Sequence, residues 1–227
     1  PDETANYNFA KLYAQGGGLE IFEKYNLYAD DIIRPRSVRS DHGVLKPVSF
    51  LGIILIYGKI AGLIGYKILP YLTPLFASVG IIFYYLLIKK FFGRTNALIS
   101  ALLLASFPPY IYYSARSMFH NVLFVALLIM GLYFGIKMAE KSQNRSLAPD
   151  KGAKLLAAAL SGGFIGLAII TRASELLWIA PMLIILWLFN IKRIGLVKLL
   201  IFLSFLFLSF LPVFYWNKIL YGSPWRG

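Results

Sequence analysis

The sequence contains no cysteine, which excludes disulfide bonds, thiolate metal sites and a cysteine nucleophile. It is also poor in charge, because 15% of its residues are charged whereas soluble domains average about 25%. It has no phosphate-binding glycine loop, no GxGxxG fingerprint and no HExxH pattern. Its two histidines, His42 and His120, are far apart in the chain, so a Ser-His-Asp triad has no support beyond single residues.

Apolar residues are abundant instead. They make up 59% of the chain, the mean hydropathy is +0.68, and much of this lies in long runs. A helix needs about 20 apolar residues to cross the hydrocarbon core of a membrane. We therefore predict an all-α fold, a polytopic integral membrane helical bundle with about six spans. The candidate spans are residues 68–88, 96–113, 118–138, 154–171, 173–189 and 197–216.

The net charge of +13 raises the question of nucleic-acid binding, but the distribution of the charge favours membrane topology. Of the 23 lysines and arginines, 11 fall in three short loops between apolar segments. Positive loops of this kind are typical of the cytoplasmic side. By chain order, all three loops lie on the same side. They are residues 89–95, 137–154 and 190–198.

A seventh apolar stretch, residues 47–66, is ambiguous. It carries Lys59 in its middle and four glycines along its length. A lysine at the centre of the bilayer costs about 2.5–3.5 kcal/mol on insertion scales. If this stretch spans the membrane, residues 1–46 are cytoplasmic. If it lies along the membrane interface, residues 1–46 are outside. Residues 1–46 hold seven of the ten acids and show no positive bias, which favours the interfacial reading.

If residues 47–66 lie along the interface, nearly all ionisable residues outside the three basic loops lie on the outer face. That face contains residues 1–67, the turn near 112–121, "TRASE" at 171–175 and the end beyond 217. Charge gathered on one side of a membrane bundle indicates a functional site there.

The opening "PDETANYNFAKLYAQGGG" predicts a short helix from about Thr4 to Gln15, ended by Gly16–Gly18. A structural reading explains its acids without chemistry. Asp2 is then the helix N-cap, and Glu3 is an acid in the first turn that the helix dipole favours. The functional reading makes the same carboxylates part of a site.

Three further segments allow a structural and a functional reading. In "DHGVLKPVSF", Lys46 either snorkels at the membrane surface or awaits a lipid phosphate, and His42 is interpreted as a surface residue rather than a metal ligand. In "FPPYIYYSARSMFHN", Arg116 either anchors the chain at the interface or binds an anionic group. In "GLAIITRASELLW", Arg172 and Glu175 form an i,i+3 ion pair on the structural reading.

An ordered set of motifs resembles one group of membrane enzymes. After the acidic opening come "LKPVSF", "LLIKKFFGR", "ALISALLLASFPPYIYYSAR", "GLAIITR" and "YWNKILYGSPW". This order is similar to that of GT-C type polytopic glycosyltransferases, in particular the protein O-mannosyltransferase and aminoarabinose-transferase group with its RgtA/B/C/D-like members. The likeness extends over nearly the whole chain. It implies two juxtamembrane helices on the outer face and makes 47–66 one of them.

The resemblance implies an activity as well as a fold. The family moves a sugar from a polyprenyl-phosphate carrier to a lipid, glycan or protein acceptor, with inversion, at the outer face of the plasma membrane. It implies membrane lipids as partners and no nucleic acid. We expect residues 1–67 to form an outer catalytic loop and residues 68–227 an incomplete transmembrane GT-C domain. The chain starts at Pro1 without an initiator Met and is expected to be an N-terminal fragment that is inactive alone.

The resemblance also implies roles for individual residues. Asp2 is the catalytic base, Glu3 orients it or contacts the acceptor, and Lys46 and Arg116 bind the donor phosphate. Four more residues are assigned to the acceptor or to structure, namely His42, Asn121, Arg172 and Glu175. Asn121 stands where the family commonly has Asp, which puts any metal or acceptor role at that position in doubt. A divalent cation is the one cofactor considered, and no metal ligand is assigned.

Two other classes fit part of the sequence. A transporter or flippase for a lipid-linked glycan also needs outward cations and spans, but it is expected to carry charged or broken helices at mid-membrane depth. A membrane scaffold without chemistry fits the composition but leaves the ordered motifs unexplained. The enzyme is therefore the preferred reading.

Overall fold

The computed structural model describes residues 2–35, 37–48, 50–140 and 151–225. It is 80% helical, which confirms the all-α class. The chain divides into two compact units. The first consists of Pro1–Phe76, Tyr112–Leu123 and Leu211–Gly227, and the second of Ala77–Ile111 and Phe124–Phe210. The first unit thus contains the whole predicted outer loop, whose boundary at residue 67 stays a prediction.

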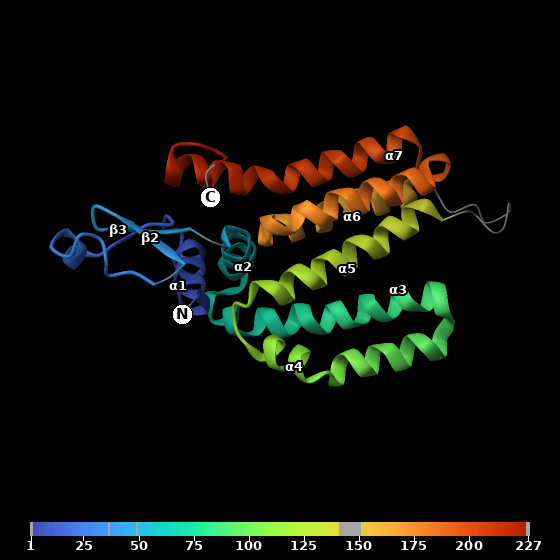
Figure 1. The fold of residues 1–227 in the computed structure, drawn as a ribbon, viewed down its shortest axis with the longest axis horizontal. Coiled ribbons are helices and arrows are strands. Elements are labelled where there is room, and N and C mark those ends of the chain that lie inside the picture. The colour runs from blue at the N-terminus through green and yellow to red at the C-terminus, as the bar shows by residue number, and fades with distance from the viewer. Residues whose placement is uncertain (1, 36, 49, 141–150, 226–227) are drawn as a thin grey trace. The chain divides into compact units, whose positions relative to one another are not determined.

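Figure 1 labels the elements along the chain. In order they are α1 (Asp2–Ala14), β1 (Ile21–Phe22), η1 (Lys24–Leu27), β2 (Val38–Asp41), β3 (Val44–Pro47), α2 (Leu51–Ile64), η2 (Tyr66–Ile68), α3 (Leu69–Ser106), α4 (Pro108–Ala115), α5 (His120–Ala139), α6 (Lys151–Thr171), η4 (Ala173–Glu175) and α7 (Leu176–Tyr221).

Helix α1 is the predicted opening helix, but it begins two residues earlier than expected, so Asp2 lies within its first turn rather than ahead of it. Its end agrees with the prediction. Gly16 has a φ of 79°, and the amides of Gly16 and Gly17 donate to the carbonyls of Tyr13 and Leu12 at 3.1 and 3.0 Å. This pair of bonds is a Schellman motif, which needs a left-handed residue at the position of Gly16.

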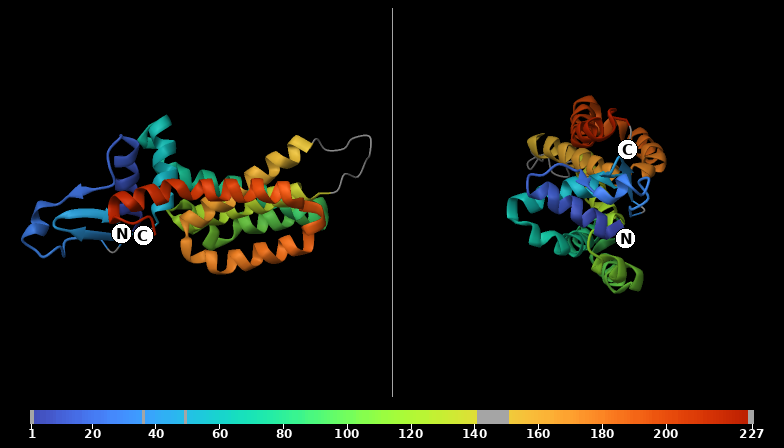
Figure 2. Two further views of the ribbon diagram at one scale, coloured as in Figure 1. Left: turned by 90° about the horizontal axis from the view of Figure 1, so that it is seen from above. Right: turned by 90° about the vertical axis from the view of Figure 1, so that its left-hand side faces the viewer.

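Helices α1 and α2 pack side by side in the first unit (Figures 1 and 2). A Cβ added to Gly58 would lie 3.0 Å from the carbonyl oxygen of Ala10 and 2.6 Å from Cδ1 of Tyr13. A Cβ on Gly62 would lie 3.4 Å from the carbonyl oxygen of Ala14. Two of the glycines that made residues 47–66 ambiguous therefore allow close helix packing.

The length of α2 bears on whether residues 47–66 cross the membrane. The helix has 14 residues and is about 21 Å long at 1.5 Å per residue, which is shorter than the hydrocarbon core of about 30 Å. Lys59 is exposed on it. Among the described residues, α2 is one of the shorter apolar helices rather than one of membrane-spanning length, and its position along an interface stays a prediction.

The chain between α1 and α2 forms a small antiparallel sheet, which was not predicted. Its strand order is β1-β3-β2, with Asp41 opposite Val44 across a two-residue turn. The turn residues His42 and Gly43 have φ values of 50° and 79°, as a type I′ hairpin turn requires. The strands have two to four residues each, which is too short to give a readable alternation in the sequence.

Within the described residues, four helices are long and apolar enough to cross a membrane: those ending at Ser106, Ala139, Thr171 and Tyr221. The second unit holds most of each. Two of them are bent at glycines with positive φ, Gly93 in α3 and Gly195 in α7. At each bend the chain folds back on itself (Figure 1). The predicted span 96–113 is also interrupted, because α3 ends at Ser106 and α4 begins afresh at Pro108, a residue suited to a helix start.

The three basic segments meet at one end of the second unit, in their described parts. Lys90, beside the bend of α3, forms an ion pair with Glu140 just beyond α5. Lys198, beside the bend of α7, donates to the carbonyl oxygen of Met138 at 3.1 Å. Met138 and Ile194 share a buried cluster. The expected loops therefore lie together, although residues 141–150 of the middle loop are outside the described residues.

Small residues set the contacts between the long helices of the second unit. A Cβ on Gly162 of α6 would lie 2.1 Å from the carbonyl oxygen of Phe202 in α7, and a Cβ on Gly166 would lie 2.8 Å from that of Leu206. A Cβ on Gly131 of α5 would lie 2.5 Å from Ile165. Glycines four residues apart allow helix backbones to approach closely in membranes. Packing of α6 therefore depends on glycine at these positions.

Candidate functional site

The first unit brings the acidic opening of the chain to the "YYSAR" segment. A guanidinium nitrogen of Arg116 lies 2.7 Å from Oε1 of Glu3, which is in the first turn of α1. The Glu3 side chain is 22% exposed and that of Arg116 is 40% exposed, so the pair is only partly screened by water. Asn6, one turn further along α1, places its amide 3.5 Å from the carbonyl oxygen of Met118. Two motifs more than a hundred residues apart thus form one charged cluster.

Aromatic rings surround the arginine of this cluster. The guanidinium carbon of Arg116 lies 5.5 Å from the ring centre of Tyr112 and 5.7 Å from that of Phe119. Phe119 also stacks on Tyr113 at 4.7 Å. Such rings attract a cation through their negative faces and fix its plane. Arg116 is therefore held in place by one carboxylate and two rings, with part of its surface open.

Asp2 lies beside this cluster in the sequence, in the first turn of α1. Its side chain is half-buried. Within the described residues it has no hydrogen bond or ion pair. An ionised carboxylate carries only acceptor sites, so Asp2 can accept a hydrogen bond or a proton from a molecule outside the chain.

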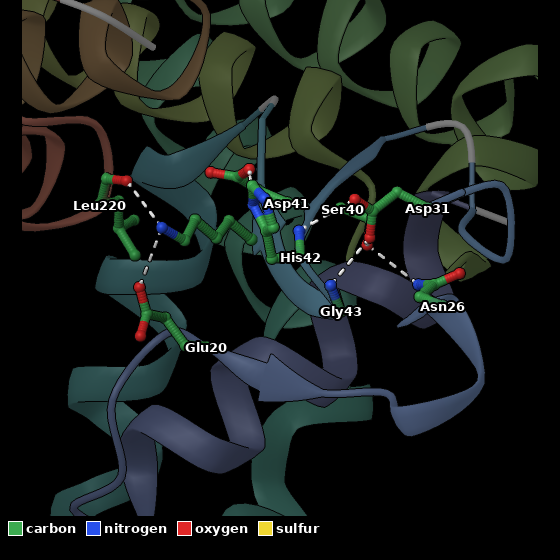
Figure 3. Close-up of polar contacts among 9 residues, drawn as sticks. Glu20, Asn26, Asp31, Ser40, Asp41, His42, Gly43 and Leu220 are labelled. Atoms are coloured by element: carbon green, nitrogen blue, oxygen red, sulfur yellow. Dashed lines mark hydrogen bonds and ion pairs between the residues drawn. The ribbon is translucent and has the colours of Figure 1, made fainter. Parts of the chain in front are cut away.

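Lys46 belongs to a second cluster in the first unit, whose members Glu20 and Leu220 are labelled in Figure 3. Its ammonium lies 3.3 Å from Oε1 of Glu20 and donates to the carbonyl oxygen of Leu220 at 3.2 Å. The Tyr221 hydroxyl donates to the carbonyl oxygen of Pro47, the residue after Lys46. The Lys46 side chain is only 18% exposed, so it does not snorkel freely. It places a cation at the C-terminal end of α7, where the helix dipole favours one.

His42 occupies the turn between β2 and β3. Its side chain is 94% exposed, and Nδ1 lies 3.0 Å from a carboxylate oxygen of Asp41. Asp31 holds this turn by accepting bonds from the amides of His42 and Gly43 at 2.9 and 2.8 Å and from the hydroxyl of Ser40 (Figure 3). These bonds, that of Ser40 first, lower the pKa of Asp31. The interpretation of His42 as a surface residue agrees with this position.

The remaining predicted site residues lie at the start of α5 and in the connection between α6 and α7. Asn121 is half-buried in the first turn of α5. Arg172 and Glu175, in the second unit, form the expected i,i+3 pair at 2.7 Å, and the indole of Trp178 donates to the other oxygen of Glu175. Both carboxylate oxygens are thus satisfied within one turn, which favours the structural reading of this pair.

Several residues of these clusters were missed in the sequence. Glu20 follows a glycine run without any motif, and Leu220 takes part through a backbone carbonyl, which no side-chain pattern reveals.

Phe50 precedes α2 with a left-handed φ of 62° and stacks on His120 with ring centres 3.5 Å apart. Left-handed backbone is uncommon for a bulky residue and marks a local constraint. Its partner His120 also contacts Phe119, with ring centres 5.5 Å apart, so this contact extends the Arg116 cluster.

A hollow of about 470 Å³ lies elsewhere in the first unit. Its walls are Asp30, Asp31, Ile32, Arg34 and Pro35. None of the predicted site residues lines it. Since Asp31 is already used to hold the hairpin turn, the hollow is not assigned to the candidate site.

The donor set for a metal is sparse in the described part of the chain. There, no three His, Asp or Glu side chains gather closely enough to hold a metal ion. No chemical step is therefore assigned to a divalent cation.

The chain matches a family of known proteins. Residues 51–216 match the model of the dolichyl-phosphate-mannose-protein mannosyltransferase family. The matched part includes Arg116, Asn121 and Arg172, while Asp2, Glu3 and Lys46 precede it. No curated protein and no solved structure matches the chain. Because the family model covers well over half of a chain with four membrane-length helices, the chain belongs to the dolichyl-phosphate-mannose-protein mannosyltransferase family of membrane glycosyltransferases.

Proposed function

We propose that this protein transfers a sugar from a polyprenyl-phosphate-linked donor to a lipid, glycan or protein acceptor. The transfer takes place at the outer face of the plasma membrane and inverts the anomeric centre. The observation that carries this proposal is the 2.7 Å ion pair between Glu3 and Arg116, which joins an acidic motif outside the family match to a basic motif inside it.

The reaction gives each charged group of the site a task. The acceptor hydroxyl attacks the anomeric carbon, and its proton passes to the carboxylate of Asp2 as the new C–O bond forms. The bond from the anomeric carbon to the phosphate oxygen breaks, and the phosphate leaves with the electron pair. The sugar passes through an oxocarbenium-like transition state. Glu3 fixes Arg116 and the first turn of α1, which positions Asp2.

The leaving phosphate gains negative charge as the bond breaks. A cation held in place stabilises that charge more in the transition state than in the ground state. Arg116 is fixed by Glu3 and two rings and still has exposed surface, so it is our first candidate for this contact. Lys46 is the second candidate, because one of its three N–H donors remains for a phosphate oxygen beside Glu20 and Leu220.

The basic end of the second unit supports the proposed sidedness. Lysines and arginines gather at cytoplasmic loops, so we assign the end with the bends of α3 and α7 to the cytoplasm. Counting each arm of the two bent helices separately gives six crossings, with α5 and α6 as the unbent pair. The helix ends away from the bends, at Leu69, Ser106, His120 and Tyr221, are then outside.

The test is sugar transfer in membranes that contain the protein, with dolichyl-phosphate-linked radiolabelled mannose as the donor. Asp2→Asn should lower the transfer rate by about 10²-fold or more, because a general base contributes about 10²–10⁴-fold, while donor binding is retained. Asp30→Asn removes an exposed carboxylate of the same unit and serves as the matched control. Unchanged transfer in Asp2→Asn would return Asp2 to a purely structural role. Movement of lipid-linked sugar across the bilayer without transfer would overturn the proposed function.

A further inference from the structure

The Lys46 cluster contains an acid that the proposed reaction does not use. Glu20 is 47% exposed, whereas the ammonium it contacts belongs to a side chain that is 18% exposed. It stands outside the family match and carries none of the motifs. A carboxylate beside a cation that is proposed to meet a phosphate raises the question of what Glu20 does when the phosphate arrives.

We propose that Glu20 is an internal occupant of the phosphate site, and that donor binding displaces its carboxylate from Lys46. This inference rests on the proposed function and names a residue that sets donor affinity. In the free protein Glu20 neutralises a poorly exposed ammonium, which is costly to leave without a counter-charge. In the complex the donor phosphate takes over that role.

Charge explains why the two anions exclude each other. Glu20 and a lipid phosphodiester each carry one negative charge, and Lys46 carries one positive charge. Both anions at one ammonium leave a net negative charge and place like charges a few ångströms apart, which is unfavourable. The carbonyl of Leu220 is neutral and remains bonded to Lys46 in either state. Displacement therefore concerns Glu20 alone.

The local backbone allows this movement. Glu20 follows the run Gly16–Gly18, and no atom lies within 4 Å of the Cβ position at Gly16 or Gly18. Leu19 is fully buried and fixes the backbone just before Glu20. The side chain of Glu20 can rotate into water while its backbone stays in place. Because half-exposed ion pairs contribute little stability, its release is easily offset by a phosphate contact.

The test measures binding of polyprenyl phosphate, without sugar, to the purified full-length protein in detergent. Glu20→Gln keeps the shape of the side chain and removes the competing charge, so it should tighten the dissociation constant by about two- to fivefold, the range given by an exposed ion pair. The KM for the sugar donor should fall by the same factor while kcat stays unchanged.

Glu23→Gln is the matched control. It makes the same change of net charge three residues further along, at a side chain that caps η1 by accepting from the amide of Tyr25, as a glutamine oxygen also can. It should leave both constants unchanged. Equal tightening in the two variants would mean a general charge effect and would overturn the inference, as would weaker or unchanged binding in Glu20→Gln.

The two proposals fail separately. If Glu20→Gln tightens phosphate binding while Asp2→Asn transfers sugar normally, the catalytic assignment is wrong and the displacement stands. If Asp2→Asn loses transfer while Glu20→Gln binds as wild type, the enzyme stands and Glu20 is a structural partner of Lys46.

Discussion

The two units of the chain differ in where their charged groups lie. In the first unit, the ion pairs of Glu3 with Arg116 and of Glu20 with Lys46 join segments that are distant in sequence. In the second unit, the contacts of Lys90 and Lys198 also join distant segments, but they lie at the bends of the helices, while glycines allow the closest approaches between α5, α6 and α7. Substitutions at the charged pairs of the first unit should therefore act on chemistry, and substitutions at the closely packed glycines of the second unit should act on folding.

The largest expected effect is in the second unit. Gly162→Ala places a Cβ where the carbonyl oxygen of Phe202 lies 2.1 Å away, and a backbone atom can yield only if α6 and α7 separate. Overpacking costs about 1–3 kcal/mol, occasionally more. We expect loss of monodisperse protein in size-exclusion chromatography. Gly163→Ala, at a neighbour with nothing within 4 Å, is the control and should behave as wild type.

The next largest effect is expected from a comparison of the two Arg–Glu pairs, each with an N···O distance of 2.7 Å. Arg116→Ala should lower kcat/KM for sugar transfer by about 10²-fold, because it removes a fixed donor to the leaving phosphate, while the protein stays folded. Arg172→Ala breaks a pair confined to one turn, which is worth a few tenths of a kcal/mol, and should lower the same constant by less than about threefold. Similar losses in the two variants would place both arginines in the reaction.

A smaller effect is expected between α1 and α2. Gly58→Ala meets the backbone oxygen of Ala10 at 3.0 Å and should lower the unfolding free energy of the first unit by about 1–3 kcal/mol. In Gly62→Ala the new Cβ lies 3.4 Å from the carbonyl oxygen of Ala14, an ordinary contact, so this variant should change the unfolding free energy little. Limited proteolysis of residues 1–67 measures the difference. Equal resistance of the two variants would show that the helices separate without cost.

The smallest effect depends on pH. The pKa of Asp31 is lowered from 3.8, so its contribution to stability is fully present above that value and is lost as the pH falls through the lower folded-state pKa. Hydrogen exchange at the amides of His42 and Gly43 should therefore accelerate only below about pH 4. In Asp31→Asn it should be fast already at neutral pH. Fast exchange in wild type at neutral pH would contradict this role for Asp31.

The sequence predicted those parts of the fold that depend on local composition. Apolar length predicted the long helices, and the glycine run predicted the end of α1. It did not predict the bends at Gly93 and Gly195, because an isolated glycine in an apolar stretch does not show whether the helix continues. The sheet was missed because its strands are too short for an alternating pattern.

The candidate site was predicted one residue at a time. Asp2, Glu3, Lys46 and Arg116 came from motifs, but nothing in their spacing indicated that Glu3 pairs with Arg116 or that Lys46 meets Glu20. The Glu3–Arg116 pair spans more than a hundred residues and the Lys46–Glu20 pair fewer than thirty, but both depend on how the chain folds back, which a single sequence does not specify. The part played by the carbonyl of Leu220 was beyond prediction for the same reason.

Lys46 in β3 bonds to the end of α7, and Tyr221 at the end of α7 bonds back to β3. These two bonds have a consequence for local unfolding of the first unit. The last turn of α7, strand β3 and the segment at Glu20 all meet at these two side chains. Elements tied in this way exchange their amide hydrogens as one cooperative unit rather than fraying separately. The end of α7 should therefore be protected from exchange to the same degree as the strand it touches, although a helix terminus ordinarily exchanges first.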